Sequence, residues 1–179
     1  MRLTVDRVVN DPNNVAITID GYVPVDIKLL DPQGLPPLYW RVGDGKKSLL
    51  EWAVLPETGF LSSITLVIMN PSFVHKVDSL PVNLTGSKYG LPVVNLGLWE
   101  GSENDDFSHR FVDDFNVNIQ AFISSKSILL LIDGSKEKTN WIRCGDDIYL
   151  GTDDGRNITN LFLDNLTQEE IESFFEAVS

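Results

Sequence analysis

Residues 49–69 read LLEWAVLPETGFLSSITLVIM, and this stretch decides the fold class. Two apolar runs, Leu49–Leu55 and Phe60–Met69, flank the tetrapeptide Pro56-Glu57-Thr58-Gly59. Proline pre-sets the backbone angle that begins a turn, and glycine supplies the positive φ that many turns require. Two strand-like runs joined in this way predict an antiparallel β-hairpin.

The residues on either side of this hairpin also favour strands. In Phe115–Ile123, apolar residues alternate with Asn116, Asn118 and Gln120, which is typical of a half-buried antiparallel strand. Further short strands are predicted at Leu3–Val9, Val15–Ile19, Val23–Leu30, Leu38–Val42, Val82–Thr85, Val93–Leu96, Ile128–Ile132, Trp141–Cys144, Ile148–Thr152 and Ile158–Leu163.

Two helices are expected beside the strands. Thr167-Gln168-Glu169-Glu170 is a capping box, and the apolar residues that follow it have helical spacing: Ile171, Phe174, Phe175 and Val178. In the acidic stretch 99–115, Phe107, Phe111 and Phe115 are spaced so that they would share one helical face. The predicted fold is therefore α+β: one globular domain over residues 1–179, mainly antiparallel β-sheet, with a short acidic helix and a C-terminal helix packed on it.

Composition limits the partners that the protein is expected to bind. The 179 residues carry a formal net charge of −12, which argues against direct binding to nucleic acid or to an anionic membrane and favours a basic partner. The longest apolar run, Ile128–Ile132, is far shorter than the roughly 20 residues of a membrane helix. The first residues do not resemble a signal peptide, so we expect a cytoplasmic protein.

Residues that could carry chemistry are few. The single cysteine, Cys144, excludes an intrachain disulfide and a cysteine metal cluster, and we expect it to be a small buried residue. Neither His75 nor His109 belongs to a nucleophile motif. Adjacent aspartates, such as Asp153-Asp154, fit turns better than a cation site. We therefore identify no catalytic, metal-ligating or cofactor-binding residue and expect no enzymatic activity.

Segment 100–114 is the main candidate for partner binding, because it holds six carboxylates and a single arginine. Such a segment is either a solvated surface or a docking surface that attracts a basic protein. A second candidate follows the proline-rich loop 31–37, where two aromatic residues suit an interface. The candidate partner-binding residues are Glu100, Glu103, Asp105, Asp106, Asp113, Asp114, Tyr39 and Trp40.

Three segments resemble parts of small bacterial immunity proteins: residues 29–37, the hairpin with its Glu51 and Thr58-Gly59 turn, and the C-terminal LDNLTQEE of residues 163–170. These proteins neutralise polymorphic or contact-dependent toxins in the cell that makes them. The resemblance implies an immunity protein that covers the active or substrate-binding surface of a toxin domain. A nuclease is the expected toxin, because an acidic protein can imitate a polyanionic substrate. The alternatives are an accessory β-rich domain without a toxin, or a hydrolase with an unrecognised carboxylate site.

Overall fold

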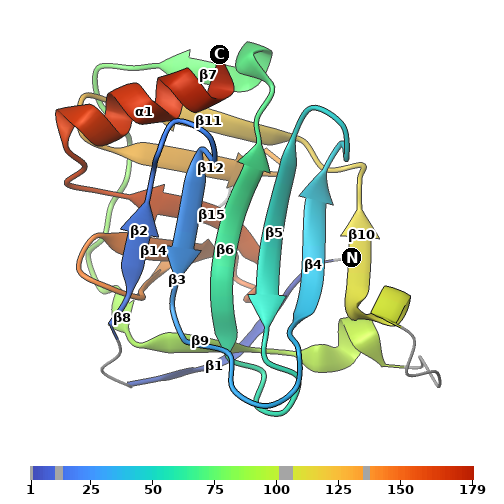
Figure 1. Cartoon of the computed structure of the whole chain (residues 1–179). Coiled ribbons are helices and arrows are strands. Elements are labelled where there is room, and N and C mark those ends of the chain that lie inside the picture. The colour runs from blue at the N-terminus through green and yellow to red at the C-terminus, as the bar shows by residue number, and fades with distance from the viewer. Residues whose placement is uncertain (1, 11–13, 101–106, 135–137) are drawn as a thin grey trace.

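A computed structural model describes residues 2–10, 14–100, 107–134 and 138–179. Two β-sheets face each other and enclose a shared core, and a small two-stranded sheet lies at one end (Figure 1). The strands are β1 Val5–Val9, β2 Ala16–Thr18, β3 Val25–Lys28, β4 Leu38–Gly43, β5 Leu49–Val54, β6 Leu61–Ile68, β7 Val74–Lys76, β8 Lys88–Tyr89, β9 Leu91–Val94, β10 Phe111–Asp114, β11 Ile119–Ile123, β12 Ile128–Ile132, β13 Asn140–Arg143, β14 Ile148–Thr152 and β15 Ile158–Leu163.

The six-stranded sheet has the order β10-β4-β5-β6-β3-β2 and is built around the predicted hairpin. Strands β5 and β6 pair antiparallel, which confirms the prediction from residues 49–69. Their turn is closed by hydrogen bonds from Leu55 N to Phe60 O (2.9 Å) and from Gly59 N to Leu55 O (2.8 Å). Gly59 has a φ of 75°, the conformation for which a glycine was expected there.

The seven-stranded sheet has the order β7-β11-β12-β15-β14-β13-β8, and β1 pairs with β9 in the small sheet. The central strands β11, β12, β15, β14 and β13 pair antiparallel. Parallel pairing occurs where an outer strand joins a sheet: β10 with β4, β7 with β11, and β8 with β13. The predicted mainly antiparallel architecture is thus present, with parallel strands at three of the four edges of the two large sheets.

The core lies between the two large sheets and receives every second residue of their strands. Trp40 and Val42 of β4 and Trp52 of β5 point inward and are almost completely buried. The opposite sheet contributes residues such as Ile119 and Leu130 to the same core. Burial of this much apolar surface is the main force that holds two sheets together.

The C-terminal helix α1, Gln168–Val178, lies across one end of the sandwich, near β7 and the turn that follows β2 (Figure 1). The predicted capping box is present: Thr167 Oγ1 accepts from Glu170 N at 3.2 Å, and Glu170 Oε2 accepts from Thr167 N at 2.7 Å. Ile171, Phe174 and Val178 are buried. Phe175 is only half-buried, so the expected apolar stripe is narrower than its sequence spacing indicates.

Three short 3₁₀ helices connect strands: η1 Pro71–Phe73, η2 Leu96–Trp99 and η3 Phe107–Arg110. The short acidic helix predicted before residue 115 is not present in the described part of that segment. There, η3 is followed directly by strand β10, because residues 111–114 pair with β4. Residues 82–85, also predicted as a strand, form a loop that packs on the outer face of the seven-stranded sheet.

Candidate partner-binding surface and neighbouring pocket

Strand β10 forms one edge of the six-stranded sheet and brings the end of segment 100–114 onto the outer face of that sheet. Its register with β4 places Phe111 opposite Tyr39 and Asp113 opposite Arg41. Arg41 in turn lies opposite Glu51 of β5. Among the described residues, no helix or strand covers this face (Figure 1). We call these five residues, Tyr39, Arg41, Glu51, Phe111 and Asp113, the β10 surface.

Arg41 holds the β10 surface together. Its guanidinium donates from Nε to Asp113 Oδ1 at 2.6 Å and from Nη2 to Asp113 Oδ2 at 2.8 Å. The same group lies 4.5 Å from the centre of the Phe111 ring. The Phe111 ring stacks on Tyr39, with 5.1 Å between centroids and 12° between planes. A bidentate ion pair and two stacked rings fix the positions of these side chains before any partner binds.

The charges on this surface influence each other. The hydrogen bonds to Asp113 raise the pKa of the Arg41 guanidinium, against the opposing effect of its partial burial. Partial burial raises the pKa of the Glu51 carboxyl, and the negative charge of Asp113 adds to this, while Arg41 opposes it. The ionised form of Glu51 is therefore disfavoured by its surroundings, although Arg41 partly compensates for it.

Two further hydrogen bonds hold Arg110, in the described end of the acidic segment. Trp99 Nε1 donates to the backbone oxygen of Arg110 at 3.1 Å, and Arg110 Nη1 donates to the backbone oxygen of Pro36 at 2.7 Å. The second bond joins segment 100–114 to the proline-rich loop 31–37. The described end of the acidic segment, residues 107–114, therefore contacts the loop that was chosen separately from the sequence.

The predicted partner-binding residues occupy different environments. Glu100 is exposed, Asp114 is half-buried, Asp113 is paired with Arg41, and Tyr39 is half-buried against Phe111. Glu103, Asp105 and Asp106 lie outside the described residues. Trp40 is 1% exposed and packs in the core against Trp52, with 6.0 Å between ring centroids. Consecutive strand residues face opposite sides of a sheet, so Trp40 points away from the surface that Tyr39 occupies.

Sequence reasoning missed Arg41, Glu51 and Phe111 as members of this surface. The sequence contains one usable signal, because Tyr39 and Arg41 are two positions apart and must share a face if residues 38–42 form a strand. The pairing of β10 with β4 spans 72 positions, however, and no local pattern predicts it.

A pocket of about 860 Å³ lies on the outer face of the other, seven-stranded sheet. Its apolar lining includes Leu129, Leu131 and Trp141, which belong to a small cluster separate from the main core. The remaining walls come from β1, from residues 81–88 and from the turn between β14 and β15.

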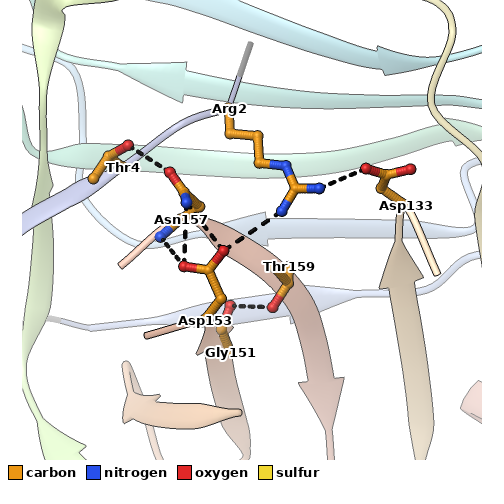
Figure 2. A network of polar contacts seen from close by, with 7 residues as sticks. All are labelled: Arg2, Thr4, Asp133, Gly151, Asp153, Asn157 and Thr159. Atoms are coloured by element: carbon orange, nitrogen blue, oxygen red, sulfur yellow. Dashed lines mark hydrogen bonds and ion pairs between the residues drawn. The ribbon is translucent and has the colours of Figure 1, made fainter. Parts of the chain in front are cut away.

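A polar network at this turn fastens the N-terminal segment to the sheet (Figure 2). Arg2 donates from Nη2 to Asp133 Oδ2 at 2.7 Å and from Nη1 to Asp153 Oδ2 at 3.5 Å. Asn157 donates to Asp153 from both its backbone (2.8 Å) and its side chain (3.0 Å to Oδ2), and accepts from Thr4 at 2.9 Å. Burial alone would raise the pKa of Asp153, but these hydrogen bonds and Arg2 outweigh it and lower that pKa.

Two of the groups considered for catalysis, His75 and Cys144, pack against other side chains or are buried, and His109 is exposed. His75 stacks on Phe122, with 4.9 Å between ring centroids. Cys144 is buried, as expected, and this burial raises the pKa of its thiol to about 12. Within the described ranges, no cluster of three or more His, Cys, Asp or Glu residues could hold a metal ion. None of the described helices is long and apolar enough to cross a membrane.

Comparison with known proteins shows a similarity to an immunity protein. No family model matches the chain. Over 85 residues the chain is 58% identical to a protein named Immunity protein CdiI-1 from Escherichia coli O157:H7 (strain EC869). The aligned region covers 48% of this chain and 99% of the relative. Nearly the whole of the relative is therefore matched by about half of this chain.

Proposed function

The chain belongs to the immunity proteins of contact-dependent inhibition systems, and on this premise we propose that it covers the active or substrate-binding surface of a cognate toxin domain. The proposed docking site is the β10 surface together with the adjoining acidic segment 100–114. The proposed toxin is a basic nuclease that is neutralised in the cytoplasm. In this proposal the protein acts by binding and performs no catalysis.

The arrangement of the β10 surface is the observation that carries the proposal. Half-buried tyrosine and phenylalanine rings and an arginine lie on an open sheet face, and these residue types are enriched in protein interfaces. The ion pair between Arg41 and Asp113 orders them in advance, so less entropy is lost when a partner docks.

The neighbouring charge supports a basic partner. Segment 100–114 contains six carboxylates and one arginine, within a chain of net charge −12. Such a surface attracts a positively charged protein over several ångströms and speeds its association. Nucleases bind a polyanion, so their substrate clefts carry Lys and Arg residues. This complementarity supports a nuclease as the toxin.

Association kinetics with the purified toxin domain test the docking site. The decisive variant replaces four carboxylates before β10, Glu100→Gln, Glu103→Gln, Asp105→Asn and Asp106→Asn, and leaves the pair between Arg41 and Asp113 intact. We expect the association rate constant to fall by about tenfold at low ionic strength, and the difference to shrink as salt is added.

A matched control removes the same number of charges elsewhere. The exposed residues for this control are Asp78, Asp146, Glu169 and Glu172, replaced by Asn or Gln. Both variants change the formal net charge by the same amount, so only the position of the charges differs. Equal association rates for the two variants would show that overall charge, and not segment 100–114, attracts the toxin.

The class of toxin is tested by a nucleic-acid degradation assay. The toxin domain alone is expected to cleave RNA or DNA, and an equimolar amount of this protein is expected to stop the cleavage. If a toxin that the protein binds tightly leaves both nucleic acids intact, the toxin is not a nuclease, although the immunity function stands.

A further inference from the structure

The pocket on the seven-stranded sheet combines an apolar floor with selected polar groups. Leu129 and Trp141 are 7% and 9% exposed, although they lie outside the main core. Trp141 packs closely on the sheet at Gly151, where a Cβ would lie 3.1 Å from the indole ring and 2.8 Å from Asn160. The volume of about 860 Å³ lies within the range of small-molecule sites.

The carboxylates that line this pocket already accept hydrogen bonds from other side chains of the protein. Asp153 accepts from Asn157 and Arg2, as described above (Figure 2). Asp154 accepts from Asn140 at 3.2 Å, and Asp6 accepts from Asn95 at 3.3 Å. Arg2 partly offsets the charge of Asp153, whereas the amide donors satisfy hydrogen bonds of Asp154 and Asp6 without removing their charge.

Two cationic side chains that line the pocket form no such contact with the described residues. Lys88 and Lys138 are exposed, and within the described part of the chain neither ammonium group forms a hydrogen bond or an ion pair. The third cation of the lining, Arg156, donates to the backbone oxygen of Asp6 at 3.0 Å. The pocket thus presents two available positive charges in a strongly acidic protein.

Asn160 adds a hydrogen-bonding group at the pocket. It is 5% exposed, and its Nδ2 donates to Thr139 Oγ1 at 2.9 Å. Its Oδ1 has no hydrogen-bond partner among the described residues. A buried amide oxygen without a donor is unfavourable.

We infer that this pocket binds a small planar aromatic anion. In this arrangement the aromatic body lies against Trp141 and Leu131, and the anionic group faces Lys88 and Lys138. The pocket and the β10 surface lie on different sheets, so this binding does not depend on the toxin-docking proposal.

Two fluorescent probes with almost the same ring system provide the test. Anilinonaphthalene sulfonate has a planar naphthalene ring that carries an anionic sulfonate, and N-phenylnaphthylamine lacks only the sulfonate. We expect saturable, one-to-one binding of the sulfonate to the folded protein, and weaker binding of the neutral probe. Absence of saturable sulfonate binding to the folded protein would overturn the inference.

Charge variants separate this site from general surface binding. Lys88→Gln with Lys138→Gln is expected to weaken sulfonate binding by about three- to tenfold and to leave the neutral probe unchanged. The matched control, Lys28→Gln with Lys46→Gln, removes two exposed lysines of the other sheet and should leave both probes unchanged. Equal weakening by the control would overturn the inference, as would equal weakening of both probes by the pocket variant.

The floor of the pocket is tested separately with Trp141→Leu, which retains an apolar side chain but removes the planar ring. Both probes are expected to bind several-fold more weakly. A denaturation midpoint recorded for each variant confirms that it is folded. Unchanged probe binding to folded Trp141→Leu would show that the probes bind elsewhere and would contradict the inferred site.

Discussion

Arg41 is the residue whose replacement should disturb the β10 surface most. It forms a bidentate ion pair with Asp113 and also lies opposite Glu51. Arg41→Gln removes the only cation of this group and leaves two carboxylates on the same sheet face. Asp113→Asn leaves Arg41 with Glu51 as its remaining anionic neighbour. The two replacements are therefore expected to differ, although each breaks the same ion pair.

The size of the effect follows from exposure and geometry. The side chains of Arg41 and Asp113 are 27% and 37% exposed, so solvent weakens the attraction between them. A pair of this kind contributes at most about 1 kcal/mol to the free energy of unfolding. We expect Asp113→Asn to cost no more than about 1 kcal/mol, and Arg41→Gln about 1–2 kcal/mol because of the uncompensated carboxylates.

A double-mutant cycle measured by urea denaturation tests this reasoning. Once Asp113 is neutral, adding Arg41→Gln should cost less than it does in the wild-type protein, because fewer carboxylates remain unpaired. High salt should reduce the coupling between the two replacements. Strictly additive effects, or a larger loss from Asp113→Asn than from Arg41→Gln, would refute the view that Arg41 balances both carboxylates.

Further predictions concern the helix, the thiol and Glu51. Phe174→Ala should lower the free energy of unfolding by about 3–5 kcal/mol, because this ring is completely buried. Phe175→Ala should lower it by less, because Phe175 is only half-buried. Equal decreases for the two variants in urea denaturation would contradict this. Thr167→Ala should cost about 1 kcal/mol in the same assay through loss of the cap, and no change in midpoint would show that the cap is dispensable. Cys144 should react with a thiol reagent only after unfolding, so rapid labelling of the native protein would contradict its burial. Because the pKa of Glu51 is raised in the folded state, ionisation of this carboxyl lowers the free energy of unfolding as pH rises from 4.5 through the raised pKa. Glu51→Gln should therefore increase the free energy of unfolding at neutral pH and have no such effect below pH 4.5. An increase that persists in acid would indicate another cause.

The sequence predicted best those strands that are bounded by clear turns. The bounds of β12, β14 and β15 coincide with the predicted ranges, because each of these strand-like runs is flanked on both sides by an Asn, Asp or Ser residue. Residues 111–114 were wrongly predicted as helical because phenylalanines four positions apart suit a helix. Pairing with β4 provides backbone hydrogen bonds that the local pattern cannot reveal.

The candidate site was predicted only in part. The density of carboxylates in the sequence identified segment 100–114 as a candidate. Its contact with loop 31–37, through the hydrogen bond from Arg110 to Pro36, is visible only in the structure. The sequence does not show which of Tyr39 and Trp40 faces outward, because alternation fixes only that they face opposite sides. The pocket escaped prediction altogether, since its lining comes from strands and loops distributed over the whole chain.

The network around Asp153 has a consequence for the order in which the chain folds. Arg2 and Asp153 are 151 positions apart, and Thr4 and Asn157 are 153 apart. A ribosome adds about 5–20 residues per second, so the first residues wait many seconds for their partners to be synthesised. Closing such a long loop before its contacts form is slow. The N-terminal segment is therefore expected to dock on the seven-stranded sheet only after β15 has been synthesised, late in the formation of the fold.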